Sequence, residues 1–295
     1  MTELPAAAPT FDGLVREHPE WRGWLTVMQA ALARAHESAW QTIAVTPALN
    51  GSAGAAWLAG ARIEMDEGLA LRWVRDLLRI AADAGAPTGH AAAVGTRRAA
   101  AVDAGAFLRA AVELDVPALE AAGAAGGLGA DLARALAHPA ALPLLAACAS
   151  RAGAQPGWDR GYCPVCAAWP AVAELRGLEA SRQLRCGRCG ADWATAWLAC
   201  VYCGNDDHRE LGGLVSESAG AMRRVDTCAR CRGYLKSVTT LTARTHAEVV
   251  LEDMATVGYD VGALGREAIR PGGLGARLGV DLRLTRRVGL LGWRR

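Results

Sequence analysis

Four cysteine pairs decide the fold of the second half of the chain: Cys163-Pro-Val-Cys166, Cys186-Gly-Arg-Cys189, Cys200-Val-Tyr-Cys203 and Cys228-Ala-Arg-Cys231. Successive pairs are separated by 19, 10 and 24 residues. Both sulfurs of a Cys-x-x-Cys turn reach one metal ion, and a second pair about 15–20 residues away completes a tetrahedron. Pairing in sequence order predicts two sites, and an interleaved pairing remains open. The predicted ligands are Cys163, Cys166, Cys186 and Cys189 for site one, and Cys200, Cys203, Cys228 and Cys231 for site two.

The residue after each pair bears on the turn geometry. Glycine reaches positive φ without strain, and Gly190 and Gly204 directly follow their pairs. Gly233 stands one residue late, and the first pair is followed by Ala167. We therefore expect ordinary turns at two of the four pairs and less regular turns at the other two.

Energy and charge both favour metal over free thiols. A β segment of this size with few large apolar side chains buries too little surface to be stable alone, and a structural tetrathiolate site contributes roughly 10–16 kcal/mol. Residues 151–245 carry 13 basic and 9 acidic residues. This excess matches the charge of about −2 on each divalent ion with four thiolates. Four arginines stand closest to the cysteine pairs in the sequence: Arg185, Arg188, Arg230 and Arg232. Their side chains are predicted either to stabilise the thiolates or to be solvated at the surface.

Other uses of the cysteines fit the pattern less well. A thiol–disulfide oxidoreductase carries one reactive Cys-x-x-Cys at the start of a helix, and iron–sulfur clusters need denser spacings. A nucleic-acid-binding zinc-ribbon protein is the alternative hypothesis, although no basic helix or aromatic-interleaved basic face is evident. Cys148 stands alone in an apolar stretch and is interpreted as a small buried hydrophobe.

The chain before the cysteines has a helical pattern. Apolar residues recur at helical spacing from Trp21 to Ala35 after the start signal His18-Pro19, and again over 62–84. Two more helices are predicted over about 91–114 and 116–137. Short connections containing glycine or proline favour an antiparallel bundle.

From Gly157 the pattern changes to short extended segments separated by turns. Strands are predicted at Gln183–Cys186, Trp193–Cys200, Arg223–Cys228 and Tyr234–Leu241. Residues 246–258 return to a helical pattern, and the tail from Pro271 is open between a strand, a docking arm and disorder. The fold class is therefore predicted as α+β: a helical domain (1–150), two four-cysteine β modules (151–196 and 197–245), and a C-terminal helix with its tail (246–295).

Composition places the protein among soluble globular chains. The 295 residues are 52% apolar and 21% charged with a net charge of +2. The first ten residues lack a basic and an apolar region, so no secretory signal is expected. The apolar stretch from 140 to 149 contains Pro143 and is too short to span a bilayer. We expect a cytoplasmic protein without membrane insertion, and its cysteines in a reducing compartment.

No catalytic constellation is found. His36-Glu37 lacks the second histidine of a zinc protease, and Gly273-Leu-Gly275 lacks the spacing of a dinucleotide site. None of the six histidines stands at ligand spacing to a cysteine pair. The sequence predicts no enzyme and no catalytic residue.

The cysteine region resembles the formate dehydrogenase accessory protein (FdhE) family. The similarity lies in Gly161-Tyr-Cys-Pro-Val-Cys166, Cys186-Gly-Arg-Cys189, Cys200-Val-Tyr-Cys203-Gly204 and Cys228-Ala-Arg-Cys-Arg-Gly-Tyr-Leu-Lys236. It extends to His18-Pro19 and to Leu251-Glu-Asp-Met-Ala-Thr256, and covers about residues 10–270. The chain departs from the family in Ala167 after the first pair and in about 24 residues after Pro271.

The resemblance implies a cytoplasmic accessory protein needed to form active respiratory formate dehydrogenase. It implies binding to the catalytic subunit of that enzyme before export, and no nucleic acid. It also implies an all-helical N-terminal domain followed by two rubredoxin-like or zinc-ribbon-like modules, with the eight paired cysteines as metal ligands. Iron is the metal implied by the family, but spacing alone accepts either iron or zinc. Neither the oligomeric state nor the partner surface follows from the sequence.

Overall fold

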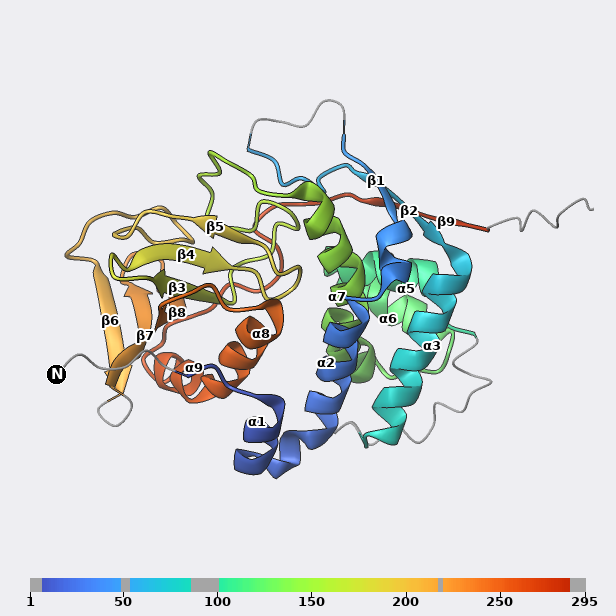
Figure 1. Cartoon of the computed structure of the whole chain (residues 1–295), viewed down its shortest axis with the longest axis horizontal. Helices are drawn as coiled ribbons and strands as arrows, with labels where there is room; N and C mark the ends of the chain where they lie inside the picture. The colour runs from blue at the N-terminus through green and yellow to red at the C-terminus, as the bar shows by residue number, and fades with distance from the viewer. Residues whose placement is uncertain (1–6, 49–53, 86–100, 217–219, 287–295) are drawn as a thin grey trace, which may run out of the picture.

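The computed structural model describes residues 7–48, 54–85, 101–216 and 220–286. The helices of residues 11–152 gather in one part of the molecule, called the helical part, and a six-stranded sheet with the helices of residues 246–264 beside it forms the other, called the ribbon part (Figure 1). A buried cluster runs from the helices into the first cysteine site. The predicted α+β class is confirmed.

The helical part is built around α7 (Ala130–Ala152), against which α2, α5 and α6 pack. The helices are α1 (Phe11–Glu17), α2 (Arg22–Arg34), α3 (Glu67–Asp83), α5 (Ala104–Glu113) and α6 (Val116–Ala124), with 3-10 turns at Pro19–Trp21 and Ser38–Thr42. Aspartates at the N-caps of α3, α5 and α6 each accept a backbone N–H in the first turn. The predicted helix over 91–114 is observed only as α5, since residues 86–100 lie outside the described ranges.

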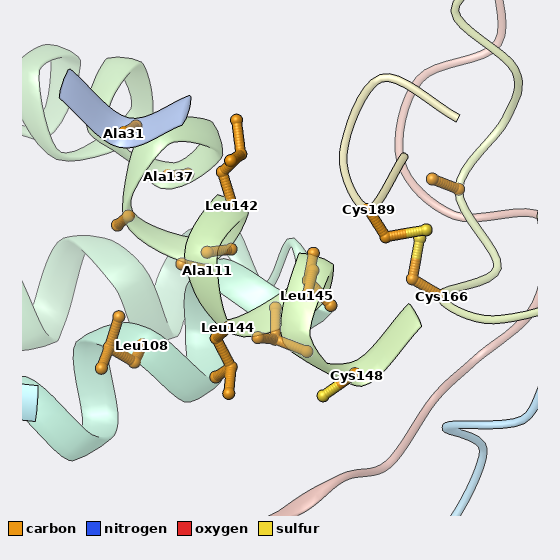
Figure 2. Packing of buried hydrophobic residues seen from close by; sticks show 14 of the residues in the cluster. Ala31, Leu108, Ala111, Ala137, Leu142, Leu144, Leu145, Cys148, Cys166 and Cys189 are labelled. Atoms are coloured by element: carbon orange, nitrogen blue, oxygen red, sulfur yellow. The ribbon is translucent and has the colours of Figure 1, made fainter. Parts of the chain in front are cut away.

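The apolar stretch from 140 to 149 lies within a longer helix, because α7 continues through both Pro139 and Pro143. Trp73 donates its indole N–H to the carbonyl of Ala140, 2.9 Å away, between the two prolines. By length and composition α7 could cross a membrane, yet 72% of its most apolar window is buried in the protein. That burial is typical of a core helix in a soluble protein, and Figure 2 shows Leu142, Leu144 and Leu145 packed there.

The helical part is not wholly helical, which corrects the all-helical expectation. Residues 62–66, predicted as helix, form β2 (Arg62–Asp66) in a sheet with β1 (Ala44–Thr46) and β9 (Asp281–Thr285). Ile63 and Met65 are buried while Arg62 and Glu64 are exposed, as in a half-buried strand. The sequence leaves the tail open between a strand, a docking arm and disorder. Its residues 281–285 form a strand, β9, which pairs in parallel with β2 (Figure 1).

The ribbon part holds one continuous sheet with the strand order β5-β4-β3-β8-β7-β6. Its strands are β3 (Val172–Arg176), β4 (Ser181–Arg185), β5 (Asp192–Ala194), β6 (Leu211–Ser216), β7 (Gly220–Cys228) and β8 (Tyr234–Thr240). Each cysteine module supplies three strands in the order third-second-first. The two modules join where β3 pairs in parallel with β8, so they repeat along a single sheet.

The strand predictions are correct in part. The segments 183–186, 223–228 and 234–241 correspond to β4, β7 and β8, whereas only 193–194 of the predicted strand at 193–200 is extended, as part of β5. Within the ribbon part, β3 and β6 were not predicted. The C-terminal helix is observed as α8 (His246–Ala255), followed by α9 (Val257–Leu264).

Charged groups join α8 to the sheet. Glu252 of α8 is 1% exposed and accepts from Arg223 of β7 at 2.6 Å. Lys236 of β8 lies 2.8 Å from Asp253 and 2.6 Å from Asp260. These ion pairs attach α8 and α9 to the second module.

Candidate metal centres

Each cysteine pair forms a tight turn closed by backbone hydrogen bonds. The amides of Cys163, Cys186 and Cys200 donate to the carbonyls five residues later, at 2.8, 2.9 and 2.8 Å. Backbone N–H groups also point at sulfurs, with Val165 N 3.4 Å from Cys163 Sγ and Gly233 N 3.3 Å from Cys231 Sγ. Such donors stabilise thiolates.

The residue after each pair has positive φ at all four turns. The values are +55° at Ala167, +80° at Gly190, +70° at Gly204 and +58° at Arg232. The irregular turns expected at the first and fourth pairs are therefore absent, because a non-glycine residue adopts the left-handed conformation at both. This conformation costs a residue with a Cβ roughly 1–2 kcal/mol.

Site one brings the sulfurs of Cys163, Cys166, Cys186 and Cys189 within 4.8 Å of one another. Cys163 Sγ lies 3.5 Å from Cys189 Sγ, and Cys166 Sγ lies 3.5 Å from Cys186 Sγ. Four sulfurs about 2.3 Å from a zinc ion would be about 3.8 Å apart. The grouping follows sequence order, so the interleaved pairing is not observed.

Site one is enclosed where the helical and ribbon parts meet. Its cysteines are 0–3% exposed, and Figure 2 shows Cys166 and Cys189 pointing toward one another near the end of α7 that carries Cys148. Residues from both parts bind the backbone of its first turn: Trp57 N donates to Pro164 O at 2.7 Å, and Gly275 N donates to Ala167 O at 2.7 Å.

Two histidines and one arginine hold the second turn of site one. His138 of α7 and His246 of α8 each place Nε2 next to Gly187 O, at 3.1 and 2.9 Å. Arg188 donates to Ala111 O and Val112 O at the end of α5, with a shortest distance of 2.6 Å. The turn is therefore fixed to three helices.

The buried thiols of site one differ in how readily they ionise. Burial raises the pKa of Cys163 and of Cys189 well above the ordinary value. Burial also acts to raise the pKa of Cys186. Hydrogen bonds from the neighbouring thiols, of which the one from Cys163 has the largest effect, outweigh burial and bring this pKa well below the ordinary value. Four buried sulfurs with these preferences form a donor set that fits a divalent ion.

Site two has the same arrangement in a more open place. Its four sulfurs also lie within 4.8 Å of one another, with Cys200 and Cys231 at 3.6 Å and Cys203 and Cys228 at 3.8 Å. Cys203 is exposed and Cys231 is partly exposed. Burial raises the pKa of Cys200. The pKa of Cys228 is about 7, because backbone N–H groups and Asn205 outweigh its partial burial.

The four arginines predicted near the thiolates take different roles. Arg188 binds α5, and Arg185 lies 2.6 Å from the buried carboxylate of Glu174. Arg230 and Arg232 are exposed, as expected for solvated charges. None of the four has a side-chain hydrogen bond to a cysteine sulfur among those found for the described residues, but the backbone N–H of Arg230 donates to Cys228 Sγ.

Aromatic rings connect the two sites. Tyr162, next to Cys163, has its ring centroid 6.0 Å from that of Trp169, which lies 5.2 Å from the ring of Tyr202 in the Cys200–Cys203 turn. The three rings meet edge to face. All nine cysteines lie in the described ranges and none forms a disulfide; Cys148 is fully buried, apart from both quartets.

Three residues that hold the sites were not predicted from the sequence: His138, His246 and Asn205. The two histidines contact backbone rather than metal, and they lie 49 and 59 residues from Gly187. No spacing rule covers such contacts. Asn205, 3.7 Å from Cys228 Sγ, directly follows the Gly204 turn, which is the one signal available.

Comparisons with known proteins agree with the resemblance. No family model matches the chain. FdhE homologues from Edwardsiella ictaluri and Pseudomonas aeruginosa are each 32% identical, over 112 and 111 residues, and one from Pectobacterium carotovorum is 30% identical over 114. These matches cover 35–38% of this chain. The same matches cover 35–36% of each relative, so the chain spans about a third of the length of the curated relatives it matches.

A solved structure is similar over almost the whole chain. The crystal structure of the FdhE protein from Pseudomonas aeruginosa matches with a TM-score of 0.57 and 21% identity. The match covers 90% of this chain and 96% of that chain. At this identity the likeness shows a shared fold.

Proposed function

The chain resembles the FdhE family in sequence and shares the fold of a solved FdhE protein, and from this premise we propose that it is an accessory protein for respiratory formate dehydrogenase. In this proposal it acts in the cytoplasm, binds the catalytic subunit before export and is needed for the enzyme to become active. The observation that carries the proposal is the pair of four-cysteine groups within a sequence similar to that family.

We further propose that the eight cysteines ligate two metal ions, one in each group. The sulfur separations of 3.5–3.8 Å fit a tetrahedral ion, and the thiolate set suits zinc or iron equally. A bound zinc would supply structural cross-linking only, whereas iron would add one-electron exchange. The chain's own residues hold the turns: His138, His246 and Arg188 at site one, and Asn205 at site two.

A non-enzymatic role agrees with the described residues. Their buried polar groups include ion pairs inside the ribbon part, such as Glu252 with Arg223 and Lys236 with Asp260. These groups are satisfied by one another and hold α8 and α9 on the sheet. We therefore assign them to stability rather than to chemistry.

The test is genetic and biochemical. Deletion of the gene is expected to abolish respiratory formate dehydrogenase activity while unrelated respiratory enzymes keep theirs. The full-length chain should restore the activity and should capture the catalytic subunit from cells grown on formate. Cys148→Ser, which alters a buried cysteine outside both groups, should complement as well as the wild type. Full activity in the deletion strain would contradict the proposal.

The alternative of a nucleic-acid-binding ribbon protein remains separable by experiment. It predicts binding whose affinity falls steeply as salt rises. A gel shift with duplex DNA and with RNA at low salt tests this directly. We expect no retarded species, and a salt-sensitive complex would favour the alternative.

A further inference from the structure

The two four-cysteine groups differ sharply in their access to solvent. In site one all four cysteines are 0–3% exposed. In site two Cys203 is exposed and Cys231 is partly exposed, while Cys200 and Cys228 are buried. Because the sulfur geometry is nearly the same at the two sites, the difference lies in what surrounds them.

Site one is enclosed by segments from distant parts of the chain. The backbone of Pro164 and Val165 is bound by Trp57 and Leu58, and Ala167 is bound by Gly275. His138, Arg188 and His246 fix the second turn to the helices. A cavity of 730 Å³ includes Cys189 in its wall, yet Cys189 is only 3% exposed. Reaching these sulfurs requires the helical and ribbon parts to separate.

Site two includes the turn between β7 and β8 and has cavities beside it. Cavities of 260 and 320 Å³ both include Cys228 in their walls, and the first also includes Cys200. Its turns are held within the ribbon part, by Tyr202 Oη donating to Tyr234 O at 2.8 Å and by Ile269 N donating to Arg232 O at 2.7 Å. A solute can therefore approach Cys203 while every one of these contacts stays in place.

We propose that the sites divide their tasks: site one holds its metal ion permanently as part of the core, and site two exchanges its ion with thiol- or chelator-class ligands. The inference rests on the proposed binding of two ions. The four sulfurs of site two would hold the ion, and its loss would replace each Sγ–ion bond in turn by a bond from an incoming donor atom, beginning with the exposed Cys203. Each freed thiolate would take a proton from solvent, and no electron would be transferred. Site one can undergo the same exchange only after a large opening of the fold.

The experiment uses the full-length chain loaded with zinc, and a coloured zinc chelator, 4-(2-pyridylazo)resorcinol, in excess. We expect two phases of one equivalent each, the first faster by about two orders of magnitude. The Cys203→Ser variant should lose or further accelerate the fast phase only, and the slow phase should be unchanged. Release of both equivalents with a single rate constant would overturn the inference while leaving metal binding intact. A protein that binds no metal would instead contradict the proposed function.

Alkylation provides a second readout that needs no variant. Brief treatment of the zinc-loaded protein with N-ethylmaleimide, followed by peptide mass spectrometry, should modify Cys203 first. The site-one cysteines should react only when the protein is unfolded. Cys148, buried but outside both quartets, reports unfolding within the same sample. Modification of Cys163 or Cys189 as fast as Cys203 would contradict the inference.

Discussion

His138 and His246 come from different helices and place their Nε2 atoms 3.1 and 2.9 Å from the same acceptor, the carbonyl oxygen of Gly187. A carbonyl only accepts, so each ring must carry a proton on Nε2. This shared acceptor attaches α7 and α8 to the second turn of site one. This peptide group is therefore one of the places where the ribbon part and the helical part meet.

Acid should weaken this attachment. Burial, followed by the charge of Arg188, lowers the pKa of His138 from 6.5 to about 4. The unfolded chain binds the proton more tightly, so stability is complete above about pH 6.5 and falls as the pH drops toward 4, by about 3 kcal/mol in total. The same direction holds for His246, whose pKa burial also lowers.

The measurement is urea unfolding at several pH values for the wild type and His138→Gln. Glutamine can donate to Gly187 O but does not titrate, so the variant should lose less stability between pH 6.5 and 4. Protonation of cysteine thiolates affects both proteins, and the difference between them isolates His138. Parallel pH profiles would contradict the pKa assignment.

Left-handed residues at the turns predict a stabilising substitution. Arg232 has a φ of +58° and an exposed side chain, so Arg232→Gly should raise the free energy of unfolding by about 1 kcal/mol. Gly204→Ala provides the opposite control. Its φ is +70° and no atom lies within 4 Å of the added methyl, so it should destabilise by about 1 kcal/mol. Equal effects of the two substitutions would show that backbone conformation does not govern these turns.

Gly161 marks a close approach between the two modules. A Cβ there would lie 1.6 Å from the carbonyl oxygen of Val201, just after Cys200. Gly161→Ala should therefore cost at least about 3 kcal/mol, because backbone must move to admit the methyl group. Gly262→Ala in α9, where no atom lies within 4 Å, should be neutral or stabilising. Thermal unfolding of the two variants tests this, and an unaffected Gly161→Ala protein would contradict the predicted contact.

Glu174 is the buried acid at the centre of the first module. It is fully buried, with Arg185 2.6 Å and Arg176 2.5 Å away. Glu174→Gln should destabilise the protein by about 3–5 kcal/mol, because it leaves the buried guanidinium of Arg185 without its paired carboxylate. Asp192, whose side chain is 48% exposed beside Arg176, is the control: Asp192→Asn should cost less than about 1 kcal/mol. Chemical denaturation distinguishes these values, and equal losses would contradict the argument.

Sequence patterns predicted the features that depend on residues close together in the chain. The quartets follow from the spacing of the cysteine pairs, and the long helices from apolar periodicity. The pairing of β3 with β8 did not follow, since β3 contains the buried Glu174 and its partner lies more than 60 residues away. Similarly, buried and exposed side chains alternate over 62–66, as in a strand, but this segment runs directly into the amphipathic α3. The strand and the helix were therefore predicted as one helix. Whether the boundaries at residues 150, 196 and 245 separate independent folding units stays a prediction.

The central claim is that eight sulfurs bind two metal ions, four to each. X-ray absorption spectroscopy on protein purified without oxygen, together with elemental analysis, tests it most directly. The account predicts two ions per chain, each with four sulfur neighbours at about 2.3 Å, and no change in these numbers for Cys148→Ser. Fewer than two ions per chain in fully loaded protein, or nitrogen or oxygen ligands in place of sulfur, would contradict it.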